Sequence, residues 1–364
     1  MPGELLQPAP TNPYYQNGAG SEDDRHEDSD SGSEGGSEIG SPESQDDLEI
    51  IEVPDEEFPL MFRQIDGRLY HASPTAPYAL PVDAPEQQRC TMIRRFLYEL
   101  IGVHCVGPVQ EVLQADESDT RRRMALDVCT GIGDWMIDMA REFPRVRFRG
   151  FDIVPIGTRY PPRNVQFEVY DLHETFRWED GTFDLVNAQF IAMTTRNYPW
   201  VLGEVSRVLR PGGLFVSYEW DLYPFFDPSN AALSERDLSV DFPAVFRLHH
   251  AVNEALALLH VPPIARHVPE LLQRTGRFEG ISRGVLYVPI GVWHPDAGRR
   301  NIGDACLEAH RRYAQSVRAL LIQQLCTETQ ADGMISDYVR ELTASRGLVA
   351  VLYTVHARRV GAAA

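Results

Sequence analysis

The stretch Ala125-Leu-Asp-Val-Cys-Thr-Gly-Ile-Gly-Asp-Trp135 joins a short apolar run to a helical pattern through two glycines. Gly131 and Gly133 allow the backbone to approach a ligand closely, and the first turn of a helix offers free N–H groups at the same place. The stretch therefore predicts a strand that ends in a cofactor-binding turn. A turn in which the glycines serve only steric needs is the alternative.

Strand-like and helix-like segments alternate on both sides of this turn. Apolar runs typical of buried parallel strands lie at residues 124–130, 148–153, 165–171, 183–190 and 214–220. Helical periodicity occupies residues 133–143 and 198–209. Two further strand candidates, 280–290 and 348–358, flank a helical region near 303–326. The pattern predicts an α/β fold with a doubly wound, mostly parallel sheet of seven strands.

Composition and pattern divide the chain into five segments. They are a disordered acidic tail (1–58), an N-terminal helical lead-in (59–123), a cofactor-binding core (124–220), a helical cap or substrate insertion (221–280) and a C-terminal part that completes the sheet (281–364). Disorder is predicted for the tail because Gly, Ser, Pro and acidic residues dominate it, and few large apolar groups offset the entropy of ordering.

The charge and cysteine content exclude several classes of function. The net charge of −19 is concentrated in the tail, and the nearly neutral remainder offers no electrostatic footprint for direct nucleic-acid binding. All 34 basic residues are arginine, which excludes a Schiff-base or catalytic lysine. The five cysteines include no C-x-x-C pair, and no apolar run is long enough to span a membrane. We therefore expect a soluble intracellular protein, nuclear or cytoplasmic, without a metal site.

Polar residues stand at the ends of the second, third and fourth predicted strands. Asp152 ends the second strand, where a carboxylate accepts the hydroxyls of a ribose. A nicotinamide dinucleotide site shares that carboxylate but requires a third glycine where Met136 stands, so an oxidoreductase is disfavoured. Asp171 ends the third strand and either meets an adenine amino group or caps a helix. Asn187 and Gln189 end the fourth strand, where they face the amino-acid end of a cofactor or are simply polar loop residues.

In chain order, these motifs resemble those of class I S-adenosylmethionine-dependent methyltransferases. The matching residues are Leu126 to Trp135, Asp152, Asp171, Phe183-Asp184 and Val208-Leu-Arg-Pro-Gly-Gly213. More narrowly, the chain resembles the fungal LaeA-like methyltransferases, which include regulators of secondary metabolism. The narrower likeness rests on Gly67-Arg-Leu-Tyr-His71, Leu80-Pro-Val-Asp83, Pro162-Arg-Asn164, Trp293-His294 and the predicted strand Tyr353 to Arg358.

The resemblance implies S-adenosylmethionine as the cofactor and assigns its contacts by position. The implied contacts are Asp127, Cys129, Thr130, Gly131 and Gly133 for the methionine moiety, Asp152 with Ile153 for the ribose, Asp171 with Leu172 for the adenine, and Gln189 for the methionine carboxylate or the sulfonium. The chain departs from the family at Cys129, which replaces the first glycine of the usual Asp-x-Gly-x-Gly-x-Gly loop. Its side chain fits if φ is negative there, and otherwise crowds the methionine moiety and weakens cofactor binding.

Methyl transfer from a sulfonium chiefly requires alignment, and a general base is needed only if the acceptor loses a proton. His249 and His250, in the predicted cap, are the candidates for such a base. His71, His260 and His294 are further options. For each of them, a surface position or a hydrogen-bonded place in the core is the simpler interpretation.

Two functions remain open at this point. The first is a methyltransferase whose acceptor is a small molecule, such as a secondary metabolite, or a protein. The second is a LaeA-like regulatory subunit that binds S-adenosylmethionine and partner proteins with weak or no turnover. They differ in whether Cys129 tolerates the cofactor and whether the predicted cap encloses an acceptor.

Overall fold

The computed structural model describes residues 52–114, 121–233 and 235–361. The predicted acidic tail therefore lies outside the described residues as far as residue 51, and so do residues 115–120 of the polar run before the core.

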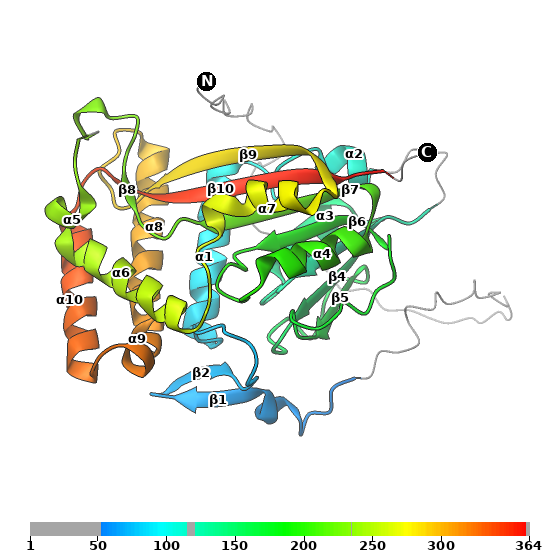
Figure 1. Ribbon diagram of the computed structural model, residues 1–364, viewed down its shortest axis with the longest axis horizontal. Helices are drawn as coiled ribbons and strands as arrows, with labels where there is room; N and C mark the ends of the chain where they lie inside the picture. The colour runs from blue at the N-terminus through cyan, green and yellow to red at the C-terminus, as the bar shows by residue number, and fades with distance from the viewer. Residues whose placement is uncertain (1–51, 115–120, 234, 362–364) are drawn as a thin grey trace, which may run out of the picture. The chain divides into compact units, whose positions relative to one another are not determined.

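An eight-stranded sheet forms the centre of the described part (Figure 1). Its strands are β3 (Met124–Val128), β4 (Arg147–Asp152), β5 (Val165–Val169), β6 (Phe183–Gln189), β7 (Leu209–Trp220), β8 (Phe225–Phe226), β9 (Phe278–Pro289) and β10 (Leu348–Arg359). The order is β5-β4-β3-β6-β7-β10-β8, with β9 also paired to β10. Strands β3 to β7 run parallel, whereas β10 is antiparallel to both β7 and β9. The predicted doubly wound, mostly parallel α/β sheet is thereby confirmed.

The sheet contains one short strand more than predicted. β8 has two residues and pairs with β10 at Leu348 and Val349, just beyond the pairing of β7 that starts at Leu352. Because β8 follows β7 in the chain and borders the same strand, it prolongs that side of the sheet. The seven long strands correspond to the seven predicted ones.

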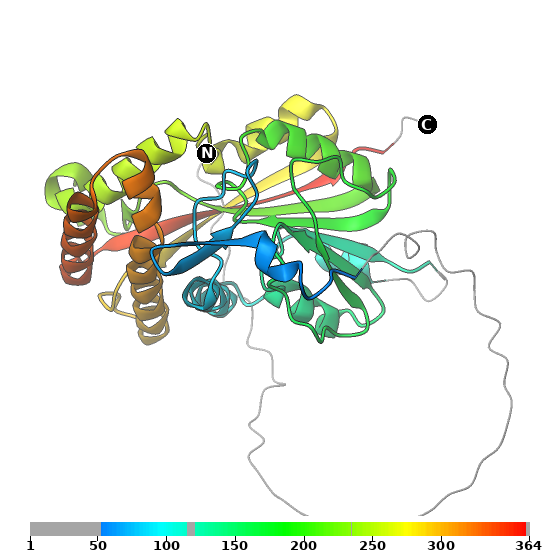
Figure 2. The same cartoon turned by 90° about the horizontal axis from the view of Figure 1, so that it is seen from below.

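Helices cover both faces of the sheet because neighbouring residues of each strand point to opposite sides. Ala125 and Leu214 pack into one hydrophobic cluster, and the next residues, Leu126 and Phe215, pack into the other. The helices on the first side are α1 (Ala84–Ile101) and α3 (Asp134–Glu142), and those on the second are α4 (Tyr198–Val208) and α7 (Val268–Thr275). Figure 2 shows these two layers above and below the strands.

A group of further helices lies beside the sheet, around β8 (Figure 1). Its members are α5 (Leu238–Asp241), α6 (Pro243–Leu258), α8 (Ala297–Ser316), α9 (Arg318–Gln324) and α10 (Glu328–Ala344). The predicted helical region 303–326 covers α8 and α9, whereas α10 was not predicted. A capping box formed by Thr327 and Gln330 starts α10.

The segment before the core is less helical than predicted. α1 starts where Asp83 accepts a hydrogen bond from the Glu86 N–H at 3.3 Å, and it ends at Gly102, which has a φ of 80°. The other elements here are the 3-10 helix Phe58–Met61, the hairpin β1 (Phe62–Ile65) and β2 (Arg68–His71), and the short helix α2 (Val109–Leu113). An ion pair of 2.6 Å between Arg68 and Asp83 ties the hairpin to the start of α1.

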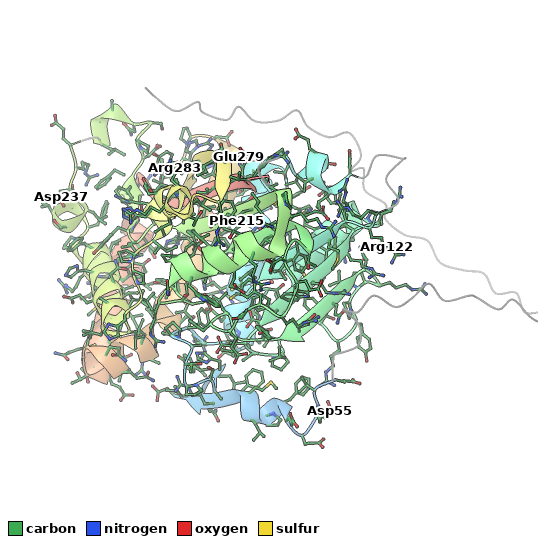
Figure 3. The ribbon with its side chains drawn as sticks, turned by 45° about the vertical axis from the view of Figure 1, so that its right-hand side comes forward. Asp55, Arg122, Phe215, Asp237, Glu279 and Arg283 are labelled. Carbon is green, nitrogen blue, oxygen red and sulfur yellow. The ribbon has the colours of Figure 1, made fainter. Side chains whose placement is uncertain are left out.

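β7 starts earlier than the predicted strand 214–220. α4 ends at Val208 and β7 begins at Leu209, so that Arg210-Pro-Gly-Gly213 lies within the strand. The pairing with β6 shifts register there, and Gly212 has a φ of 76°. Figure 3 shows Phe215 of β7 deep among the side chains, whereas Asp55, Arg122 and Asp237 lie at the periphery.

None of the helices in the described ranges combines the length and the apolar character that crossing a membrane requires.

Candidate functional site

The predicted cofactor residues meet at one edge of the sheet, where β3, β4, β5 and β6 end. A cavity of about 380 Å³ opens at this edge. Nine of the ten predicted residues line it, namely Asp127, Cys129, Thr130, Gly131, Asp152, Ile153, Asp171, Leu172 and Gln189. The tenth, Gly133, does not line the cavity and instead occupies the N-cap position of α3.

Asp127 stands at the centre of a buried polar network. Its carboxylate accepts hydrogen bonds from the Thr130 hydroxyl at 2.6 Å and from the Asn187 amide at 2.7 Å. Gln189 in turn donates to the Asn187 side-chain oxygen at 3.2 Å. Burial raises the pKa of Asp127 to about 6, although both hydrogen bonds favour the ionised form. The network holds the loop after β3 against the end of β6.

Asp152 supports the glycine turn from the neighbouring strand. Its carboxylate accepts a hydrogen bond from the Gly131 N–H at 2.8 Å and a longer one from the Val154 N–H at 3.4 Å. Burial raises its pKa, and these backbone donors oppose the rise. Because a carboxylate has about four lone-pair sites, Asp152 can still accept hydrogen bonds from a ligand in the cavity.

Asp171 is covered by a segment that lies far away in the sequence. The Thr75 hydroxyl donates to its carboxylate at 3.0 Å, and the His173 N–H donates at 2.9 Å. Burial alone favours the neutral form, but the hydrogen bonds from His173 and Thr75 together lower the pKa of Asp171. The Arg196 guanidinium donates to the Thr75 carbonyl at 2.6 Å and to the Leu259 carbonyl at 2.9 Å. Arg196 thus ties this segment to the end of α6.

The two glycines of the turn have different roles. Both have positive φ, 58° at Gly131 and 81° at Gly133. A Cβ atom added at Gly133 would lie 2.2 Å from the Phe167 ring, whereas one added at Gly131 would meet no atom within 4 Å. Gly133 is therefore required for packing of α3 on the sheet, and Gly131 leaves open space toward the cavity.

Cys129 does not have the negative φ at which its side chain would fit easily. Its φ is 55°, in the left-handed region that disfavours residues with a Cβ. Phe190, which also lines the cavity, has a φ of 60°, and its ring stacks on Trp220 with centroids 6.0 Å apart. Backbone strain of this kind concentrates at functional sites.

We expect Cys129→Gly to leave the free energy of unfolding unchanged or to raise it by up to about 1 kcal/mol. Relief of the left-handed strain contributes about 1 to 2 kcal/mol, and the greater freedom of glycine in the unfolded chain offsets about half of that. Cofactor binding should be equal or tighter. Denaturant titration and calorimetry with S-adenosylmethionine measure the two quantities.

The matched control is Cys129→Ala, which keeps the Cβ and the strain but removes the sulfur. If affinity falls clearly in both variants, the sulfur is an adapted contact of the cofactor site, and the expectation for Cys129→Gly is wrong.

Glu219 brings a further buried carboxylate to the cavity, from the end of β7. It is 2% exposed and accepts hydrogen bonds from the backbone N–H groups of Ile191 at 3.0 Å and Ala192 at 3.2 Å. These donors favour the ionised form, but burial has the larger effect and raises the pKa of Glu219 to about 8. A carboxyl group with such a pKa changes its charge near physiological pH.

The structure separates the two candidate bases. His249 lines the cavity, is 8% exposed, and its Nδ1 lies 3.0 Å from the Leu222 carbonyl. Burial lowers its pKa to about 3. The His250 side chain is 52% exposed, lies 3.6 Å from Glu254 and does not line the cavity. The remaining options, His71, His260 and His294, do not line it either.

Several cavity residues were not predicted. They include Glu86, Arg89, Asn253 and His310. Each lies in a segment before or after the core and reaches the cavity only through the chain's tertiary contacts. The only sequence signal was the spacing of His249 and Asn253, which places both on one face of a helix.

Comparisons with known proteins show which family this chain resembles. Residues 125–213 match a family described as a methyltransferase domain. The chain is 31% identical to the secondary metabolism regulator laeA of Coprinopsis cinerea over 297 residues, which cover 80% of this chain and 72% of that protein. It is 27% identical to the protein-methionine methyltransferase laeA of Emericella nidulans, over 66% of this chain and only 60% of that protein.

Among solved structures, the chain is similar to a phosphoethanolamine N-methyltransferase from Haemonchus contortus. The TM-score is 0.41 and the sequence identity 15%, with 84% of this chain and 72% of that chain covered. A likeness at this level says nothing about the acceptor.

Proposed function

This chain belongs to the LaeA-like family of methyltransferases, and we propose that it binds S-adenosylmethionine and transfers the methyl group to a small molecule or a protein. The observation that carries the proposal is the meeting of Asp127, Asp152 and Asp171 on the wall of one cavity at the carboxyl ends of parallel strands. When bound, the cofactor supplies an activated methyl group on a sulfonium.

The residues of the cavity suit this cofactor. Asp152 would accept the ribose hydroxyls, with Ile153 beside it. Asp171 and Leu172 would bind the adenine. The loop from Asp127 to Gly131 and the side chain of Gln189 would bind the methionine moiety. The open space at the α-carbon of Gly131 is where a cofactor could approach the backbone.

The charge of this wall also fits. Asp127, Asp152 and Asp171 bring three carboxylates to the cavity, and S-adenosylmethionine carries a net positive charge. Glu219 adds a further carboxyl group, and a nearby cation would favour its ionised form. The site therefore attracts the cationic cofactor and holds its neutral product less strongly.

The acceptor is either a small molecule, such as a secondary metabolite, or a protein. The relative from Emericella nidulans carries the name of a protein-methionine methyltransferase. A thioether has no proton to lose, so an acceptor of that kind requires alignment but no base. A hydroxyl or amine acceptor would instead need a partner for its proton. His249 is the candidate that lines the cavity, and its lowered pKa makes it a weak base.

A second candidate function is a regulatory subunit that binds S-adenosylmethionine and partner proteins with weak or no turnover. The left-handed backbone at Cys129 favours it, because the Cβ stands where the family has glycine. The relative from Coprinopsis cinerea is likewise named a regulator of secondary metabolism.

We expect calorimetry to show binding of S-adenosylmethionine to the full chain. If the protein binds the cofactor and, after incubation with a fungal extract and labelled cofactor, transfers label to a small molecule or protein, it is a methyltransferase. Binding without transfer would favour the regulatory subunit. Absence of binding at millimolar cofactor would exclude both functions.

A further inference from the structure

Helices α6 and α8 supply a part of the cavity wall that the cofactor assignment does not use. We call it the helical wall, and its residues are His249, Asn253 and Leu256 of α6 and Cys306, His310 and Tyr313 of α8. The cofactor residues come from the strand ends, and the helical wall comes from the helices beside the sheet. It therefore requires an explanation of its own.

The His249 imidazole presents an unused hydrogen-bond acceptor in this wall. Its Nδ1 lies 3.0 Å from the Leu222 carbonyl, and a carbonyl only accepts, so Nδ1 carries the hydrogen. In the neutral ring, Nε2 then carries a lone pair and can only accept a hydrogen bond. This Nε2 atom is buried and has no hydrogen-bond partner among the described residues. Burying such an atom is costly unless a ligand donates to it.

Asn253 presents an unused donor one turn further along α6. Its side-chain nitrogen, Nδ2, is also buried and has no partner among the described residues. Residues four apart lie on the same face of a helix, with Cβ atoms about 5 to 6 Å from each other. The helical wall thus offers one acceptor and one donor, side by side and at a fixed separation.

Aromatic rings surround the His249 imidazole. The ring of Tyr313 is nearly parallel to it, with an interplanar angle of 25° and centroids 6.3 Å apart. The ring of Tyr223, which also lines the cavity, lies 6.2 Å from it, and that of Tyr338 lies 5.7 Å from it. Of these rings, Tyr313 and Tyr223 line the cavity together with His249, and aromatic surfaces favour an aromatic ligand.

The charges next to the helical wall are paired. Arg89 donates to the Glu86 carboxylate at 2.9 Å, and the Ser316 hydroxyl donates to the same carboxylate at 2.6 Å. The Arg89 guanidinium lies 5.7 Å from the centre of the Tyr313 ring. Burial lowers the pKa of His310 to about 4, so this imidazole is neutral at physiological pH. An uncharged wall favours an uncharged ligand, because a buried charge would have no counter-charge.

From these contacts we propose that the helical wall binds the methyl acceptor, a neutral, planar aromatic compound with a hydroxyl group. The hydroxyl donates a hydrogen bond to Nε2 of His249, and a second oxygen of the compound accepts one from Nδ2 of Asn253. The substrate class is therefore hydroxylated aromatic small molecules. This inference rests on the proposed function, since it names the acceptor of the same cavity.

The test uses 2-naphthol as the probe and the full chain saturated with S-adenosylhomocysteine. Calorimetry should show binding of 2-naphthol, and 2-methoxynaphthalene, which lacks the donor, should bind at least about tenfold more weakly. The anion 2-naphthoate should also bind more weakly. Equal binding of 2-naphthol and 2-methoxynaphthalene, or no binding of 2-naphthol at its solubility limit, would overturn the proposal.

Two variants and one control locate the site. His249→Leu should weaken 2-naphthol binding about tenfold and abolish the discrimination against 2-methoxynaphthalene. Asn253→Leu removes the second contact and should weaken binding of 1,3-dihydroxynaphthalene more than that of 2-naphthol. Arg247→Leu, at an exposed position of the same helix, should change neither. Undiminished discrimination in a folded His249→Leu variant would place the ligand elsewhere.

Cofactor binding separates this inference from the proposed function. If S-adenosylmethionine binds but the naphthols do not distinguish the variants, the helical wall is not the acceptor site, and the methyltransferase proposal stands. If S-adenosylmethionine itself does not bind, the proposed function fails first. Unchanged binding of S-adenosylhomocysteine to His249→Leu shows that this variant is folded.

Discussion

Asp152→Ala is expected to weaken S-adenosylmethionine binding by about 1 to 3 kcal/mol, or roughly 5- to 150-fold in Kd. The carboxylate is half-buried at the end of β4 and lines the cavity beside the glycine turn. Its removal takes away the acceptor for the ribose hydroxyls and the acceptor of the Gly131 N–H at 2.8 Å. Calorimetry measures the loss.

The direct contact and the support of the loop can be separated with a modified ligand. An analogue of S-adenosylhomocysteine without ribose hydroxyls should bind the wild-type protein less well than the parent compound. Asp152→Ala should bind the two compounds equally. Asp180→Ala, an exposed carboxylate that pairs with Arg207 at 3.1 Å, is the control and should behave as wild type. Undiminished preference for the hydroxylated compound in Asp152→Ala would show that another residue holds the ribose.

We expect the protein to lose about 1 to 2 kcal/mol of stability between pH 6.5 and pH 8 through Glu219. Burial raises the pKa of Glu219 from its ordinary value of 4.5 to about 8. Above pH 4.5 the unfolded chain releases this proton, whereas the folded protein keeps it until the pH approaches 8. The contribution of Glu219 to the free energy of unfolding is therefore fully present below pH 4.5 and is lost as the pH rises through 8.

Within the window from pH 6.5 to pH 8, the comparison with Glu219→Gln isolates Glu219 from the other buried groups. The raised pKa of Asp127, about 6, and the lowered values of His249 and His310 also make stability depend on pH, but they do so equally in the wild-type protein and in the variant. Denaturant titrations at several pH values measure the slope. Glu219→Gln should flatten it, whatever the absolute stability of that variant, because glutamine does not titrate.

Glu204→Gln is the matched control for that slope. Hydrogen bonds from Arg207 and Phe176 outweigh the effect of burial and lower the pKa of Glu204, so it titrates below the window. This variant should keep the wild-type slope. If Glu219→Gln keeps it as well, Glu219 is not the group that titrates.

The fold could be predicted because its signals are local. Each buried parallel strand is a continuous apolar run. In each helix between β3 and β7, apolar residues recur with the spacing of a helix. The elements that were missed are the ones with weak local signals. The hairpin of β1 and β2 is short, and α10 depends on its capping box and on packing against α6.

The position of the cofactor residues could also be predicted from the order of the strands. In a parallel sheet, all the carboxyl ends lie at the same edge, so residues that follow successive strands must come together there. Asp127, Asp152 and Asp171 reach the same cavity for this reason. Gly133 was assigned to the cofactor, but it lies beside Phe167 and outside the cavity wall, because the spacing of glycines does not distinguish ligand contact from close packing.

By itself, then, the sequence determined the α/β class, the succession of strands along the chain and the edge at which the polar residues meet. Only the tertiary structure decided the left-handed conformation of Cys129, the contact of Thr75 with Asp171, and the choice of His249 over His250 for the cavity wall. The physical reason is that these features depend on contacts between distant segments. Thr75 and Asp171 are 96 residues apart. Adjacent histidines lie on different faces of a helix, and the packing of the helix decides which of them reaches the cavity.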